Sequence, residues 1–326
     1  MTNPSLLIDP ALFADEAISE ETRTAVAMVE EAQKRLPTIM ELGAQTVRDA
    51  RKSGEGLIAD EPLSPMAEWR TIKANGIEVP VRQFVPDTVN GLYLHIHGGG
   101  HTIGAADSHD QMLSKIATDL NMAVVSVEYR LAPENPWPLP ADDCEAVSVW
   151  LAQSIKAEYG TEKIVIGGES AGAHLSAVTL LRMREHHQFT DFAGANLVYG
   201  IYDMSLTPSM QNWGDRLLIL NRPVVEWFGD NLFPPDRFTL EEKRDPLISP
   251  INAPLHDMPR ALFTVGTLDP LLDDSLFMAQ RWLSAGHHTE LEIYPGGIHA
   301  FDILPIKIAR QARQRINKFI AECIAD

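Results

Sequence analysis

Cysteine is scarce in this sequence, with only Cys144 and Cys323 among 326 residues. Two thiols are too few for the disulfide framework that stabilises small secreted domains, and they suit a reducing compartment. The amino terminus also lacks a basic segment followed by an apolar run, the pattern of a secretory signal. We therefore expect a cytoplasmic protein.

Positive charge and long apolar runs are also lacking. Lys and Arg together number 27 against 45 Asp and Glu, which gives a formal net charge of -18. Such a surface repels phosphates and argues against nucleic acid or an anionic membrane as partner. No apolar stretch approaches the roughly 20 residues of a membrane span. A neutral small molecule is the partner that the composition favours.

The most informative stretch runs from Lys163 to Leu181, where a β-rich segment breaks on glycines and continues as a helical pattern. Gly168-Glu169-Ser170-Ala171-Gly172 matches G-x-S-x-G, in which a sharp strand-to-helix turn exposes one hydroxyl at the end of a parallel strand. Side chains at the two glycines would collide with neighbouring backbone. Ser170 is therefore a candidate nucleophile. The alternative is a strand-to-helix turn that happens to contain a serine.

A serine hydroxyl needs an imidazole to take its proton and a carboxylate to orient that imidazole. Asp269 follows the strand-like segment 261–266, and His299 follows the segment 291–294 and a turn. Both lie past the carboxyl end of a strand, where open α/β sheets build their sites. The order serine, aspartate, histidine completes a candidate catalytic triad.

A glycine-rich loop supplies a fourth element. His97-Gly98-Gly99-Gly100 follows the apolar run 92–96. Such a loop presents backbone N–H groups that can stabilise an oxyanion, together with the N–H of Ala171. We expect His97 to hydrogen-bond the backbone and, with Gly98, to support the loop.

These motifs resemble those of the bacterial hormone-sensitive-lipase-like (family IV) esterases of the α/β-hydrolase fold. The resemblance covers most of the chain and its motifs stand in the family's order: His97 to Gly100, Gly168 to Gly172, Tyr129-Arg-Leu-Ala-Pro-Glu134, Asp269-Pro-Leu-Leu-Asp273 and Gly297-Ile-His-Ala-Phe301. It implies Ser170 as nucleophile, Asp269 as acid and His299 as base. It also implies that the N–H groups of Gly99, Gly100 and Ala171 form the oxyanion hole.

The resemblance further implies short-chain acyl esters as substrates, no cofactor and a homodimer formed through an exposed sheet edge. Two departures are visible. His101 stands where an aromatic residue commonly follows the glycines, and Ala300 replaces a frequent glycine. Neither is a reacting group, so they bear on substrate preference and not on the chemistry.

The periodicity of the chain predicts a mostly parallel, doubly wound α/β sheet of eight strands. A hairpin turn is expected at Asn75-Gly76. Strands are predicted at 68–73, 77–84, 92–96 and 122–129 and near 163, 195, 261 and 290. Helices are predicted at about 106–120, 141–158, 171–187, 274–286 and 304–323.

Two segments interrupt this alternation and are interpreted as a helical cap. Residues 1–55 form amphipathic helices, of which the second runs from about Thr38 to Gly54 and the first is stopped by Pro37. Residues 201–245 are rich in aromatic side chains, so that the catalytic core comprises 56–200 and 246–326. The resemblance implies the N-terminal part of the cap; the alternatives are a support for the core and a buried helical hairpin. We expect the pocket to include His101, Tyr202, Trp213, Trp227 and Phe228.

Other titratable groups have simpler interpretations. A metal site at His95, His97 and His101 is not expected, because no carboxylate or cysteine ligands accompany them. His174 is interpreted as a structural histidine and His186-His187 as a solvated helix end. Asp273 and Asp274 compete with Asp269 for the acid role, but they begin a helix, where carboxylates serve as caps. Glu169 is assigned no chemistry.

The sequence thus predicts a serine esterase for short acyl esters. Three alternatives remain: a non-catalytic small-molecule receptor on the same scaffold, an amidase and a longer-chain lipase. The physiological ester and its stereochemistry are not specified by these patterns.

Overall fold

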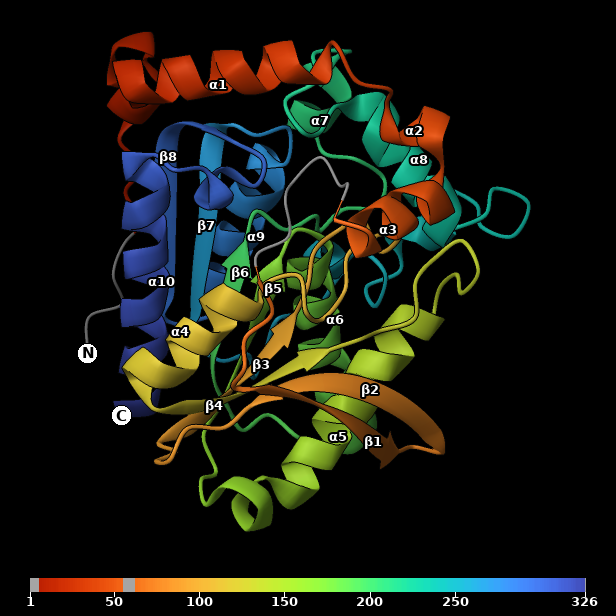
Figure 1. Cartoon of the computed structure of the whole chain (residues 1–326), viewed down its shortest axis with the longest axis vertical. Coiled ribbons are helices and arrows are strands. Elements are labelled where there is room, and N and C mark those ends of the chain that lie inside the picture. The colour runs from red at the N-terminus through yellow and green to blue at the C-terminus, as the bar shows by residue number, and fades with distance from the viewer. Residues whose placement is uncertain (1–5, 55–61, 326) are drawn as a thin grey trace.

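The computed structural model describes residues 6–54 and 62–325. Its centre is an eight-stranded sheet in the order β1-β2-β4-β3-β5-β6-β7-β8 (Figure 1). β2 pairs antiparallel with β1 and β4, and all other pairs are parallel. The strands are β1 (Ala67–Ala74), β2 (Ile77–Phe84), β3 (Gly91–Ile96), β4 (Met122–Val127), β5 (Ile164–Glu169), β6 (Phe192–Val198), β7 (Ala261–Leu268) and β8 (Thr289–Ile298).

Helices cover both faces of the sheet. α5, α6 and α9 contact one face, and α4 and α10 contact the other. The helices are α1 (Glu20–Gln33), α2 (Ile39–Leu42), α3 (Ala44–Lys52), α4 (Asp110–Leu120), α5 (Leu139–Tyr159), α6 (Ala171–His187), α7 (Pro208–Trp213), α8 (Arg222–Leu232), α9 (Leu272–Ser284) and α10 (Lys307–Ala325). The predicted doubly wound eight-stranded sheet is confirmed.

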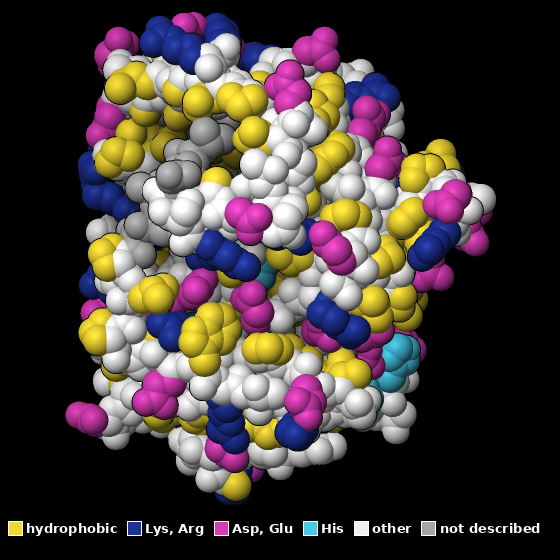
Figure 2. Space-filling view, turned by 45° about the vertical axis from the view of Figure 1, so that its right-hand side comes forward, with side chains coloured by type: hydrophobic (Ala, Val, Ile, Leu, Met, Phe, Trp, Pro, Cys, Tyr) yellow, Lys and Arg dark blue, Asp and Glu magenta, His cyan; other side chains and the backbone are white. Residues whose placement is uncertain are grey.

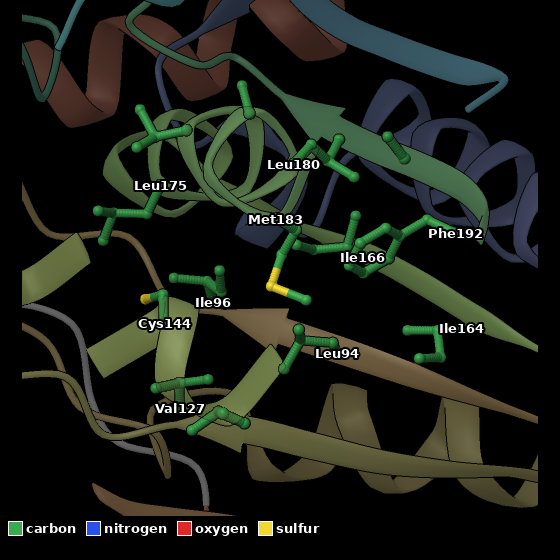
Figure 3. Close-up of a cluster of buried hydrophobic side chains, with 14 of the residues drawn as sticks. Leu94, Ile96, Val127, Cys144, Ile164, Ile166, Leu175, Leu180, Met183 and Phe192 are labelled. Atoms are coloured by element: carbon green, nitrogen blue, oxygen red, sulfur yellow. The ribbon is translucent and has the colours of Figure 1, made fainter. Parts of the chain in front are cut away.

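The central strands are apolar on both faces because each face is covered. In β5, Ile164 and Ile166 join the core beneath α5, α6 and α9, whereas Val165 joins the core beneath α4 and α10. Figure 3 shows side chains of α6, such as Leu175 and Met183, packed over this sheet. Burial on both faces explains the continuous apolar runs that parallel strands require.

The local turn chemistry follows the sequence closely. Ala74 pairs with Ile77, and the two residues between them, Asn75 and Gly76, have φ of 49° and 77°. This is the left-handed pair of a two-residue hairpin, as the Asn-Gly dipeptide predicts. The predicted helix from Thr38 is instead two helices, because Gly43 breaks it with φ of 76°.

The N-terminal helices and the segment 201–245 lie together at one end of the molecule (Figure 1). α2 contacts α8, and two polar bonds join α1 to the loop after α7: Arg216 pairs with Glu30 at 3.0 Å, and the N–H of Ile219 donates to Gln33. Two segments far apart in sequence therefore form one helical layer. The predicted boundary between residues 55 and 56 lies outside the described residues.

Helix α6 crosses strand β3 at very short range. A Cβ added to Gly172 would lie 1.8 Å from the carbonyl oxygen of Ile96, and one added to Gly168 would lie 1.9 Å from the same atom. Only glycine fits at either position. The crossing therefore holds the start of α6 directly over the end of the sheet.

Surface charge, the two thiols and the length of the helices are further features of the described residues. On the face in Figure 2, acidic and basic side chains are interspersed. Cys144 and Cys323 are both buried and no disulfide joins them. Within residues 6–54 and 62–325, the helices fall short of the length and apolarity needed to cross a bilayer.

Candidate active site

Ser170 lies at the turn between β5 and α6 and has a strained backbone. Its φ of 57° and ψ of -117° fall outside the regions that ordinary residues populate. The strain is held by hydrogen bonds on both sides: the N–H of Ser170 donates to Val198 at 2.8 Å, and its carbonyl accepts from His174 at 3.1 Å. This geometry directs the hydroxyl away from the sheet and toward the loops beyond it.

Two of those loops bring His299 and Asp269 to the serine. His299 Nε2 lies 2.9 Å from Ser170 Oγ, and His299 Nδ1 lies 2.9 Å from Asp269 Oδ2. A carboxylate can only accept, so Nδ1 carries the proton and Nε2 is left to accept from the hydroxyl. The other Asp269 oxygen accepts from the N–H of Leu271 at 2.9 Å. The structure therefore brings the three predicted residues into one hydrogen-bonded chain.

The competing carboxylates Asp273 and Asp274 are engaged elsewhere. Asp273 accepts from the N–H of Ser209, and Asp274 accepts from the N–H of Tyr202 and the hydroxyl of Thr207. Burial raises the pKa of Asp274 to about 7, although these hydrogen bonds oppose the shift. Both carboxylates tie the segment after β6 to helix α9.

The glycine loop lies beside the serine and is held by His97. The Nδ1 atom of His97 lies 2.8 Å from the carbonyl oxygen of Gly98, and the His97 ring stacks on Tyr129 with centroids 4.2 Å apart. The Tyr129 hydroxyl donates to the His97 carbonyl at 2.9 Å. Gly99 and Gly100 have φ of 110° and 57°, a conformation that glycine adopts without strain.

A cavity of about 470 Å³ opens above these groups. Gly100, Ser170 and Ala171 line its floor, and most of its wall comes from α8 and the segments beside it. The wall is mainly apolar, but it also carries Arg222, Glu226, Asp230 and Lys243. Phe228 covers Gly100 so closely that a Cβ there would lie 2.3 Å from the ring.

The predicted pocket residues are only partly placed in this cavity. His101 and Phe228 line it; Tyr202, Trp213 and Trp227 are not among its lining residues. Tyr202 is fully buried against Phe263. Trp227 directly precedes Phe228 on α8, and adjacent residues of a helix face different sides of it. The prediction is wrong for these three because aromatic content does not specify the direction of a side chain.

His95 on β3 and the two histidines that follow this strand, His97 and His101, do not converge on one point. His95 bonds Ser126 and Glu169, His97 bonds the loop backbone, and His101 Nε2 lies 3.0 Å from His174 Nδ1. His174 Nε2 lies 2.7 Å from the carbonyl oxygen of Ile248, which can only accept. His174 therefore donates through Nε2, and burial lowers its pKa to about 4, which keeps it neutral at pH 7.

Two neighbours of the site were not anticipated from the sequence. The ring of Tyr199 packs edge-on against His299 with centroids 4.7 Å apart, and its hydroxyl donates to Asp302 at 2.7 Å. Burial raises the pKa of the Asp302 carboxyl, while the Tyr199 hydrogen bond opposes this shift. The position of Asp302, three residues after the candidate base, is the only signal that the sequence offers for this contact.

Glu169, which precedes the serine, is not among the residues that line the cavity, but it makes a buried polar contact. Its oxygens lie 3.0 and 3.3 Å from His95 Nε2. Burial alone would raise the pKa of Glu169, but the nearby imidazoles lower it on balance. The pair fastens the end of β5 to β3 directly beneath the glycine loop.

Together, the fold and the hydrogen-bonded serine, histidine and aspartate define an α/β hydrolase. The sequence model of the family described as alpha/beta hydrolase fold matches residues 93–303. The chain is 33% identical to carboxylesterase NlhH of Mycobacterium tuberculosis over 72% of this chain and 75% of that protein. It is 31% identical to an arylesterase of Saccharolobus solfataricus over 77% of this chain and 82% of that protein.

Solved structures of an esterase and of a hormone-sensitive lipase also superpose on this chain. An esterase from the archaeon Pyrobaculum calidifontis superposes with a TM-score of 0.79 and 28% identity, covering 92% of this chain and 96% of that one. A hormone-sensitive lipase from a metagenome library gives a TM-score of 0.79 and 25% identity, covering 93% and 98%. The chain belongs to the α/β-hydrolase fold family and, within it, is a hormone-sensitive-lipase-like (family IV) carboxylic ester hydrolase.

The buried neutral state of His174 predicts a pH-dependent stability. Its folded pKa of about 4 is below the unfolded value of 6.5, so the unfolded chain binds more protons between these values. Stability from this group is present above pH 6.5 and is lost as the pH falls toward 4, by at most about 3 kcal/mol.

Urea unfolding of the wild type and His174→Gln between pH 7 and pH 4 measures this effect. We expect the difference in unfolding free energy between the two proteins to shrink as the pH falls. A His174→Gln difference that does not change with pH would contradict the assignment of a neutral buried imidazole.

Proposed function

We propose that the chain hydrolyses esters through Ser170, His299 and Asp269, with an acyl-enzyme intermediate. The observation that carries this proposal is the chain of two 2.9 Å hydrogen bonds from Ser170 through His299 to Asp269 at the floor of the cavity. His299 accepts the serine proton as Ser170 attacks the ester carbonyl. Asp269 stabilises the imidazolium that forms.

The later steps use the same groups in reverse order. His299 gives its proton to the leaving alcohol, which departs and leaves an ester on Ser170. Water then attacks that ester while His299 takes its proton, and the acid is released as the proton returns to the serine. The N–H groups of Gly99, Gly100 and Ala171 are proposed to stabilise each oxyanion, each by about 3 kcal/mol.

Short-chain acyl esters are the proposed substrate class. The cavity of about 470 Å³ must hold both the acyl and the alcohol group. Four charged side chains interrupt its apolar wall, so a long acyl chain would gain less than the roughly 0.8 kcal/mol that each buried methylene otherwise contributes. The name of one relative, an ethyl acetate hydrolase of Pseudomonas putida, supports the same class.

The helical layer formed by α1–α3, α7 and α8 is proposed to act as a cap. α8 and its neighbours supply most of the cavity wall, including Leu220, Val225 and Phe228. α3 is tied to the segment that follows the glycine loop, because Arg48 donates to the carbonyl oxygen of Thr102 at 2.8 Å. The homodimer implied by the family resemblance stays a prediction that light scattering can test.

Replacement of the nucleophile tests the mechanism. Ser170→Ala removes the attacking oxygen, and we expect kcat for p-nitrophenyl acetate to fall by about 10⁵-fold or more, with the unfolding midpoint retained. Ser176→Ala, which removes a hydroxyl from the helix that follows Ser170, is the matched control and should keep its activity. Retained hydrolysis by Ser170→Ala at the wild-type rate would overturn the assignment.

The choice of acid is tested by a pair of isosteric changes. Asp269→Asn removes the charge that orients and stabilises the imidazolium, so we expect kcat to fall by about 10⁴-fold. Asp273→Asn affects only the link to Ser209 and should change kcat by less than about tenfold. The reverse ranking of the two variants would show that Asp273 is the acid.

An acyl-length series tests the substrate class. We expect kcat/KM on p-nitrophenyl esters to be greatest for chains of about two to six carbons, because longer chains meet the charged part of the wall. Matched anilides measured in parallel report amidase activity. A maximum at about ten carbons or more would replace the short-chain proposal with the lipase alternative.

A further inference from the structure

We propose that Glu145, His186 and His187 form a binding site for a divalent transition metal ion such as Zn²⁺, remote from the catalytic groups. His186 and His187 end helix α6, and Glu145 lies on the neighbouring helix α5. The sequence suggested a solvated helix end. In the structure both imidazoles instead turn toward a single carboxylate oxygen.

The three ligand atoms are already assembled. Glu145 Oε1 lies 2.8 Å from His186 Nδ1 and 2.8 Å from His187 Nε2, and all three atoms lie within 4.8 Å of one another. Ligands at about 2.1 Å from a tetrahedral zinc ion are about 3.4 Å apart. Each distance from Glu145 Oε1 to an imidazole nitrogen would therefore lengthen by about 0.6 Å to admit the ion.

The donor set is one that zinc accepts in proteins. Two imidazole nitrogens and one carboxylate oxygen make three protein ligands of the kind found in open zinc sites. His186 and His187 are 45% and 28% exposed, so water can complete the coordination. The mixed nitrogen and oxygen set also suits Ni²⁺ and Cu²⁺, whereas Mg²⁺ favours oxygen ligands.

The surroundings hold the carboxylate in place and favour a cation. Arg182 donates to the second oxygen, Glu145 Oε2, at 3.0 Å and to Asp142 at 2.7 Å, which leaves Oε1 directed at the imidazoles. Two carboxylates paired with one guanidinium leave a net negative charge beside the two histidines. The carbonyl end of α6 adds a negative partial charge at the same place.

Metal binding competes with the present hydrogen bonds. Each imidazole now donates to Glu145 through the nitrogen that would bind the ion. A tautomer shift moves the proton to Nε2 of His186 and to Nδ1 of His187, and frees both lone pairs.

The bound ion would link two helices and would take no part in catalysis. Helix α6 has 17 residues, so its metal-binding end lies about 25 Å from Ser170. An ion there joins α5 to α6 and stabilises the folded state by binding it selectively. The proposal is thus independent of the mechanism assigned to Ser170.

Calorimetric titration of untagged, chelator-treated protein with ZnCl₂ tests the site. We expect one ion to bind with micromolar affinity and to raise the melting temperature, and we expect MgCl₂ to do neither. His186→Ala and His187→Ala should each weaken binding at least tenfold, and the double variant should abolish it.

His288→Ala is the matched control, since His288 is 44% exposed and lies 4.0 Å from Glu290, outside the cluster. It should bind Zn²⁺ like the wild type. Circular dichroism and ester hydrolysis of the metal-free variants should match the wild type, which separates lost binding from lost folding. No zinc binding by the wild type, or equal binding by the double variant, would overturn the proposal.

Discussion

The close crossing of α6 over β3 is the constraint on which the rest of the site depends. With Gly172 placed against the carbonyl oxygen of Ile96, the chain can turn from strand to helix within one residue. Ser170 carries the resulting strain, which costs about 1–3 kcal/mol and is offset by the buried packing of α6 on the sheet. A wider crossing would move the Ser170 hydroxyl out of reach of His299, which is placed independently by β8.

Buried polar groups surround this turn and keep its geometry. Glu169 and His95 bond beneath the glycine loop, and Tyr199 and Asp302 bond beside the candidate base. Inside a protein such hydrogen bonds are stronger than in water, and an unpaired member is correspondingly costly. Several independent hydrogen bonds therefore hold the residues around the candidate nucleophile in place, so a strained backbone can persist there.

Much of the candidate site was predictable because its parts have local signatures. The pentapeptide around Ser170, the glycine loop and the two residues past strand ends each depend on short-range chemistry. The pocket was not predictable in the same way: Tyr202 and Trp227 lie outside it, whereas Phe228 covers Gly100. Which way an aromatic side chain points depends on the packing of its helix or loop, and composition carries no record of that.

The sequence by itself determined the alternation of strands and helices, the glycines that permit the serine turn and the chain order of serine, aspartate and histidine. Periodicity, turn chemistry and apolar runs are local properties, so they can be read along the chain. Only the tertiary structure decided which groups meet: Asp269 and not Asp273 at His299, and two terminal histidines of α6 at Glu145. Such meetings depend on helix packing and loop paths, which bring together residues far apart in sequence.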